Sequence, residues 1–244
     1  MTGVLTRRVV AEALGTGLLV TVVVGSGIAA ARLSPGDTGL QLLENAFATA
    51  LGLAVLILML GPVSGAHFNP VVSAVDCWLG RRSGDGLAVR DLAAYVPAQV
   101  LGAIAGAVLA NLMFGEEAVS WSVTQRSAGQ LWIGESVATA GLIMLVFSLA
   151  RSGRSAAAPA AVGAYIGSAY WFTSSTSFAN PAVTIGRAFS DTFAGIAPGS
   201  VPAFVVFQVV GAIVGTLLLV VLYPVAGGAA GEVVVPRTES GVGS

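Results

Sequence analysis

Two Asn-Pro pairs carry the residue types and spacing in this sequence that could do chemistry. They are Asn69-Pro70-Val71 and Asn180-Pro181-Ala182. Asn is a strong helix N-cap and Pro is favoured at the first helical position, so each pair predicts a helix start. The side-chain oxygen of such an Asn accepts from the helix, which leaves its NH₂ group to donate to a passing solute. Two ordinary loop-to-helix starts are the alternative, and the repetition of the pair argues against it.

The segments after both pairs are too short to cross a bilayer. Residues 69–79 and 180–190 are 11 residues each, about half of what a membrane span needs. Polar, small-residue segments precede them, SGAHF at 64–68 and SSTSF at 174–178. Non-helical backbone at membrane depth is tolerated only where it is buried in protein or lines a cavity. We expect two half-helices whose N-termini, each carrying roughly half a positive charge, meet near the midplane and repel cations.

Composition places the chain in the membrane class. Of its 244 residues, 55% are hydrophobic and 9% charged, and the mean hydropathy is +0.87. Soluble domains carry about a quarter charged residues. Six apolar runs are long enough to cross a bilayer: residues 8–31, 39–61, 88–113, 129–150, 157–174 and 201–223. The expected partner is therefore the lipid bilayer, and the net charge of −1 gives no indication of nucleic-acid binding.

Arginines predict the orientation. The first run follows Arg7 and Arg8 and exceeds the ~7–15-residue core of a signal peptide, so a retained helix is expected rather than a cleaved one. With the N-terminus inside, the cytoplasmic segments hold most arginines: Arg7, Arg8, Arg81, Arg82, Arg90, Arg151, Arg154 and Arg237. Both termini are therefore expected in the cytoplasm, with a channel unit over 1–224 and a flexible tail over 225–244.

The two halves of the chain resemble each other. AEALGTGLL from Ala11 recurs loosely as GESVATAGLI from Gly134, FNPVVS recurs as ANPAVT, and AQVLGAIAG recurs as FQVVGAIVG. These matches pair Glu12 with Glu135. Each half, about 1–113 and 129–224, has three spans, so the second copy must insert upside down. We expect an all-α membrane protein with six transmembrane helices plus two re-entrant half-helices in an inverted 3+3 repeat.

Catalytic and metal-binding patterns are absent from the sequence. His67 is the one histidine and Cys77 the one cysteine, which is too few for a metal site. No GxxxxGK[ST] phosphate-binding motif occurs, and the serine-rich segment 174–177 has no adjacent base. We expect no enzyme activity, no cofactor and no metal.

These motifs resemble those of the aquaporin or major intrinsic protein family over almost the whole chain, SGAHFNP and the second Asn-Pro pair above all. The resemblance implies a pore in each protomer and a homotetramer. It also implies that Glu12 and Glu135 hold the re-entrant loops through hydrogen bonds to their backbone. The family places the residue at His67 beside the cytoplasmic end of the pore; a structural hydrogen bond from the loop is the alternative role.

Two departures from the family pattern concern the substrate. The first motif reads NPV, and we expect Val71 to cause a small repacking against Ala182 without loss of function. The family's usual arginine after the second motif is Val183 here. Family spacing gives a selectivity filter that is small and neutral: Thr49, Ser168, Ser177 and Val183. Gly167 is a one-residue alternative to Ser168. Such a filter favours neutral solutes larger than water.

Arg187 lies four residues after Val183, on the same face of the half-helix. It could return a positive charge to the outer vestibule, about one turn (~5.4 Å) further out. Pairing with Asp191 or with a neighbouring loop is the alternative.

A passive channel for small neutral solutes is the first functional hypothesis. YWFTSSTSFANPAVT resembles a bacterial branch of the family associated with arsenic-resistance gene clusters. This implies a bacterial inner membrane and arsenite, as As(OH)₃, or organoarsenicals beside glycerol and urea. The alternatives are a water-selective aquaporin, a proton-coupled transporter using Glu12 and Glu135, and a non-conducting structural protein.

Overall fold

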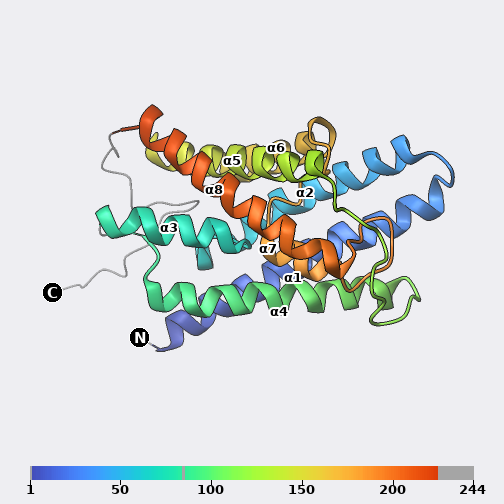
Figure 1. The fold of residues 1–244 in the computed structure, drawn as a ribbon. Helices are drawn as coiled ribbons and strands as arrows, with labels where there is room; N and C mark the ends of the chain where they lie inside the picture. Colours follow the sequence, from blue (N-terminus) through green and yellow to red (C-terminus); the bar gives the residue numbers. More distant parts are fainter. Residues whose placement is uncertain (1, 84–85, 225–244) are drawn as a thin grey trace.

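The computed structural model describes residues 2–83 and 86–224, and within these ranges it contains helices and loops but no strands (Figure 1). The α-helices are α1 (Thr2–Leu33), α2 (Thr38–Ser64), α3 (Pro70–Ser83), α4 (Val89–Met113), α5 (Gly129–Arg151), α6 (Ala158–Phe172), α7 (Pro181–Arg187) and α8 (Val201–Leu222). Short 3₁₀ turns, η1 (Ser155–Ala157) and η2 (Pro198–Ser200), precede α6 and α8. The expected all-α class is confirmed, and the expected tail 225–244 lies outside the described residues.

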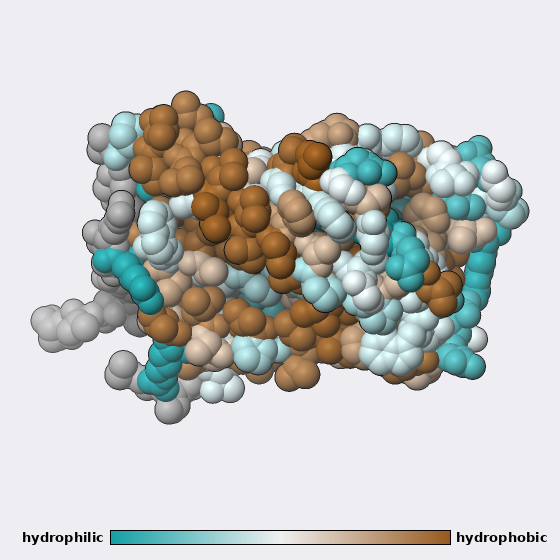
Figure 2. All heavy atoms as spheres, viewed as in Figure 1, coloured by the Kyte–Doolittle hydropathy of each residue, from teal (hydrophilic) through white to brown (hydrophobic). Residues whose placement is uncertain are grey.

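The helices differ in whether they can cross a membrane. Five of those described are long and apolar enough: α1, α2, α4, α5, and α8 together with η2. The sixth expected span, α6, has 15 residues. With η1 directly before it, it reaches about 28 Å, close to the ~30 Å hydrocarbon core. The half-helices α3 and α7 have 14 and 7 residues and cannot span it. Hydrophobic side chains cover much of the middle of the molecule (Figure 2).

The packing follows the inverted repeat. In the first half α1 packs against α2 and α4, and in the second half α5 packs against α6 and α8. Contacts between α2 and α6 join the halves, and each half-helix also contacts the last helix of the other half, α7 with α4 and α3 with α8. Helix α1 begins and α8 ends at the same end of the bundle (Figure 1). These relations bring α3 and α7 together in the middle.

Small residues set the close helix crossings. A Cβ at Gly102 or Gly106 would lie 2.1 or 2.0 Å from a backbone oxygen of α1. In the second repeat, a Cβ at Gly211 or Gly215 would lie 2.4 or 2.5 Å from a backbone oxygen of α5. Any side chain here would force the helices apart, so these glycines serve packing within the protomer.

Candidate pore

The loops before α3 and α7 adopt backbone conformations that non-glycine residues rarely adopt. In the first loop φ is positive at Gly65 (89°), Ala66 (48°) and Phe68 (49°). In the second loop it is positive at the three positions 111 residues later: Thr176 (62°), Ser177 (52°) and Ala179 (48°). A non-glycine residue in this region costs roughly 1–2 kcal/mol. Both loops therefore need strong external support, and they need it at equivalent positions.

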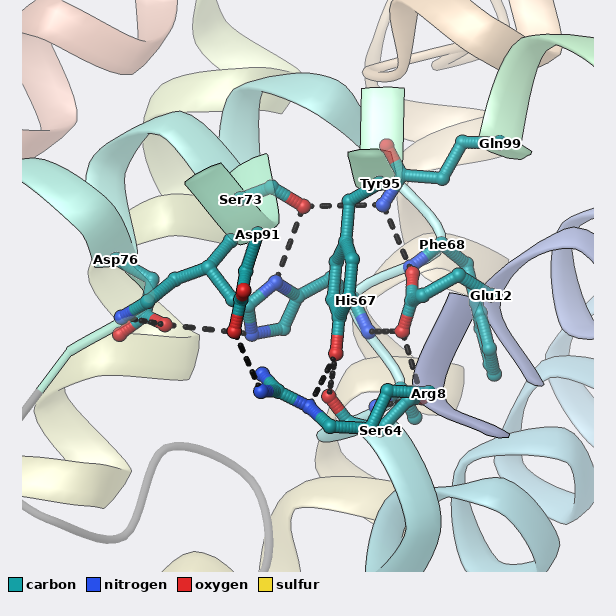
Figure 3. A network of polar contacts seen from close by, with 12 residues as sticks. Arg8, Glu12, Ser64, His67, Phe68, Ser73, Asp76, Asp91, Tyr95 and Gln99 are labelled. Carbon is teal, nitrogen blue, oxygen red and sulfur yellow. Dashed lines mark hydrogen bonds and ion pairs between the residues drawn. The ribbon is translucent and has the colours of Figure 1, made fainter. Parts of the chain in front are cut away.

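A buried glutamate supports the first loop (Figure 3). Glu12 on α1 accepts hydrogen bonds from the backbone N–H groups of His67 (3.0 Å) and Phe68 (2.7 Å). It also accepts from Ser64 Oγ at 2.7 Å and Gln99 Nε2 at 2.8 Å. Four donors thus satisfy both oxygens of a fully buried carboxylate, as burial of a charge requires.

The second loop has the same support. Glu135 on α5 accepts from the backbone N–H groups of Phe178 and Ala179, each at 2.9 Å, and from Gln208 Nε2 at 2.6 Å. Gln208 also donates to Thr184 Oγ1 at 2.8 Å. Each repeat therefore holds its loop through a carboxylate on its first helix and an amide on its last.

The two Asn side chains join the half-helices to each other. Asn69 Nδ2 donates to the carbonyl of Ala179 at 2.8 Å, and Asn180 Nδ2 donates to the carbonyl of Phe68 at 2.7 Å. Their oxygens cap the helices: Asn69 Oδ1 accepts from Val71 N at 3.1 Å, and Asn180 Oδ1 accepts from the first two N–H groups after Pro181, at 3.0 and 3.3 Å. An amide nitrogen has two hydrogens, so each Asn keeps one for a solute.

Val71, the departure in the first motif, belongs to the same apolar cluster as Ala182. It also borders a groove between α3 and α8 that Trp78 and Ala212 line. Its added methyl groups are therefore accommodated away from the cavity described next.

A cavity of about 70 Å³ runs between the two loops. This is several times the ~10–15 Å³ below which a cavity cannot hold a single water, so it has room for a few waters. The loop residues 66–69 and 177–180 form one part of its wall. Apolar side chains of α1, α2, α5 and α6 form much of the rest, among them Leu53, Ile57, Leu142 and Val146. The cavity thus has a polar strip facing an apolar wall.

Three of the four expected filter residues line this cavity: Thr49, Ser177 and Val183. Thr49 Oγ1 lies 3.1 Å from the hydroxyl of Tyr170. Ser177 Oγ is buried and has no hydrogen-bond partner among the described residues.

Ser168 does not line the cavity, which corrects its assignment. It is exposed on the outside of α6, and its Oγ donates to the carbonyl of Tyr165 at 2.8 Å. The face of α6 that lines the cavity carries Val162, Ile166 and Tyr170. Successive helical residues are about 100° apart, so Ser168 lies roughly 200° from Ile166 and points the other way. Tyr170 is the α6 hydroxyl in the wall, two positions beyond the expected one.

Replacing Tyr170 with Phe tests the contribution of this hydroxyl. The change leaves Thr49 without its partner and makes the wall less polar. We therefore expect the permeability to hydroxylated solutes to change about two- to tenfold, as the loss of one hydrogen bond of ~0.5–1.5 kcal/mol allows. Tyr165→Phe is the matched control, because the Tyr165 hydroxyl donates to Ala138 O (2.9 Å), away from the cavity. Vesicle permeability assays measure both. If Tyr170→Phe and Tyr165→Phe change solute permeability equally, the Tyr170 hydroxyl does not contact the solute from the cavity wall.

Beside the first loop, His67 lines the cavity within a polar network (Figure 3). Its Nδ1 lies 3.0 Å from Ser73 Oγ, and its Nε2 lies 3.6 Å from Oδ2 of the buried Asp76. His67 thus belongs to the cavity wall while its ring contacts Ser73 and Asp76. Nearby, Arg8 donates to the Tyr95 hydroxyl at 2.8 Å. Asp76 was not expected from the sequence; a lone acidic residue within the apolar half-helix was the available signal.

Beside the second loop, Arg187 also lines the cavity. Its Nε donates to the carbonyl of Ala194, and its Cζ lies 3.4 Å from the centre of the Phe178 ring. Of the two alternatives expected for Arg187, contact with a neighbouring loop is present at Ala194, whereas Asp191 accepts from Val123 N at 3.0 Å. Arg187 is thus held by a loop carbonyl and an aromatic ring, with no ion pair within the described part of the chain.

No group of three or more His, Cys, Asp or Glu side chains that could hold a metal occurs within residues 2–83 and 86–224. The arrangement instead offers a narrow, partly polar path with two amide donors in the middle.

Membrane-crossing helices around two half-helices that meet head to head at one cavity define a membrane channel. The family model for the major intrinsic protein family matches residues 2–177. The chain is 52% identical over 215 residues to aquaglyceroporin AqpS of Rhizobium meliloti (strain 1021), covering 88% of this chain and 89% of that protein. It is 33% identical over 237 residues to human aquaporin-2, covering 90% and 80%.

The aquaglyceroporin structure from Plasmodium falciparum has the same fold, with a TM-score of 0.65 at 19% identity, covering 88% of this chain and 95% of that one. The chain belongs to the major intrinsic protein family. Its members are passive channels, so the protein is a multi-pass membrane channel and not an enzyme.

Proposed function

We propose that the protein is a passive channel for small neutral solutes larger than water: glycerol, urea and metalloid hydroxides such as arsenous acid. The observation that carries the proposal is the small, uncharged side chain of Val183 in the cavity wall that Ser177 and Thr49 also line. A valine there leaves width that a long charged side chain would fill. The 52% identity to a protein named an aquaglyceroporin supports the same class of solute.

The two-sided wall fits such solutes. Hydroxyl or carbonyl oxygens can accept from the free Nδ2 hydrogens of Asn69 and Asn180. The carbon or arsenic side of the solute faces the apolar wall that includes Leu53 and Val146. A solute with both kinds of surface keeps its hydrogen bonds while it crosses, so the desolvation cost stays low.

Arsenous acid and organoarsenicals are the finer part of the proposal. Arsenous acid is neutral at pH 7 and is a compact trihydroxy solute, so the wall that admits glycerol also admits it. The support specific to arsenic is the resemblance of YWFTSSTSFANPAVT to the branch associated with arsenic resistance.

We also propose a homotetramer in a bacterial inner membrane, with both termini in the cytoplasm. The orientation rests on the arginines at the end where α1 begins, which include Arg7, Arg8, Arg90 and Arg151. The similarity to a bacterial protein supports the type of membrane.

Stopped-flow light scattering on proteoliposomes tests the solute range. Vesicles are exposed in turn to inward gradients of glycerol, urea and arsenous acid, with protein-free vesicles as the control. We expect shrinkage followed by fast re-swelling with each solute. Accelerated water exit without faster solute entry would instead indicate a water-selective aquaporin.

Proton coupling is disfavoured because the oxygens of Glu12 and Glu135 already accept from protein donors. We expect solute flux to be unchanged when a proton gradient is imposed across the vesicle membrane. Accumulation of solute against its own gradient would overturn the channel assignment.

A further inference from the structure

We propose that Arg187 is the charge-selecting residue of this pore and that its guanidinium forms an outer site for oxygen-rich neutral solutes. The proposal rests on the proposed channel function and deepens it, since it names the group that excludes cations where Val183 removes the family's usual arginine. The first support is the position of Arg187 in the repeat.

Arg187 occupies the place in the second repeat that Asp76 occupies in the first. Both lie seven residues after the pore asparagine, and the aromatic residues two positions before those asparagines are His67 and Phe178. In each repeat these two residues contact each other: Asp76 Oδ2 lies 3.6 Å from His67 Nε2, and Arg187 Cζ lies 3.4 Å from the centre of the Phe178 ring. The same pair of positions therefore holds an acid at the inner mouth and a base at the outer mouth.

The inner carboxylate is fully engaged with its surroundings. Asp76 Oδ2 also accepts from the backbone N–H of Leu87 at 3.1 Å, and the side chain is 4% exposed. It does not line the cavity, which His67 separates from it. The fixed acid is thus screened from a solute by the imidazole ring.

The outer guanidinium is directed differently. Arg187 itself lines the cavity, although only 2% of its surface is exposed. Its Nε donates a hydrogen bond to Ala194 O. Its Nη1 and Nη2 make no hydrogen bond to any residue in the described part of the chain. A buried guanidinium without a carboxylate partner is costly unless its donors find acceptors. Solute or water oxygens in the cavity are the acceptors available.

Ser177 contributes to the same wall, and its buried Oγ has no hydrogen-bond partner among the described residues. The guanidinium donors of Arg187 match a solute that carries several hydroxyl or carbonyl oxygens. The fixed charge opposes cations, because a unit charge several ångströms away in a poorly solvated passage acts with little screening.

Arg126 provides a matched control. Its Cζ lies 5.0 Å from the centre of the same Phe178 ring, and its Nε donates to Gly195 O at 3.0 Å, but it does not line the cavity. Arg126→Gln therefore removes a positive charge near the same ring without changing the wall. If both arginines only pack against Phe178, Arg187→Gln and Arg126→Gln should have the same cation entry. If Arg187 selects by charge, only Arg187→Gln should admit more cations.

The experiment compares wild type, Arg187→Gln, Arg187→Lys and Arg126→Gln in vesicles. Cation entry is followed with a membrane-potential dye under a sodium gradient, and glycerol entry by light scattering. For Arg187→Gln we expect cation entry to rise roughly tenfold or more, with glycerol entry retained and its preference over small apolar amides reduced. Arg187→Lys and Arg126→Gln should exclude cations as wild type does.

Unchanged cation exclusion in an Arg187→Gln protein that still passes glycerol would overturn the proposal, as would an equal leak in Arg126→Gln. If Arg187→Gln does not reconstitute, Arg187→Met keeps an unbranched chain over the ring and is judged by the same criteria. Failure of the proposed function gives a different result: the wild type would pass no solute beyond water, whatever the cation leak of the variants.

Discussion

Val183→Arg is expected to lower glycerol and urea permeability at least tenfold while lowering water permeability far less. The new side chain would enter a cavity of about 70 Å³ in which Val183 is part of the wall. Arg187 lies four residues further along the same short helix face, so two like charges would also repel each other. Narrowing and added charge both act against solutes wider than water.

Val183→Met is the matched control, because it adds an unbranched chain without the charge. Stopped-flow scattering on reconstituted protein measures water and solute permeability for both variants. We expect Met to reduce solute entry by a smaller factor than Arg. If solute permeability is unchanged in Val183→Arg, Val183 is not part of the selectivity filter.

Glu135→Leu is expected to have the largest effect on folding. It leaves the N–H groups of Phe178 and Ala179 and the amide of Gln208 buried without an acceptor. Each unsatisfied buried donor costs about 1–3 kcal/mol. The sum is a large part of the ~5–15 kcal/mol by which a folded domain is stable. We expect the variant to unfold at markedly lower temperature or to fail to reconstitute.

Glu116→Gln is the control for this prediction, because Glu116 pairs with Arg32 at the exposed surface, 2.6 Å apart. Thermal unfolding in detergent, followed by size-exclusion chromatography, compares the two. Glu135→Gln should fall between them, since one amide oxygen still accepts. A Glu135→Leu protein as stable as wild type would show that the second loop holds its backbone without the carboxylate.

The elements of the fold could be predicted from the sequence because they depend on local pattern. Apolar runs set the membrane spans, and the Asn-Pro pairs set the starts of α3 and α7 at Pro70 and Pro181. Repetition of these patterns was enough to predict the inverted repeat. Length was less predictable: α6 is 15 residues long, because a 3₁₀ turn replaces its first turn.

The contents of the cavity wall were predicted less completely. Residues next to the motifs, such as Ser177 and Val183, could be placed because the loop fixes them. Ser168 could not be placed, because the direction of its side chain depends on how α6 is rotated about its axis. An error of two residues along the helix turns the side chain to the opposite face. Asp76 and Tyr170 were missed for a related reason: each matters through a partner far away in the chain, His67 or Thr49.

The central claim is that neutral solutes larger than water pass through this one cavity down their own gradient. Its most direct test is the rate at which proteoliposomes re-swell after shrinking in an inward glycerol gradient. We predict re-swelling many times faster than in protein-free vesicles, unaffected by a proton gradient, and strongly slowed by Val183→Arg. Vesicles that lose water faster but regain volume no faster than protein-free ones would contradict the account.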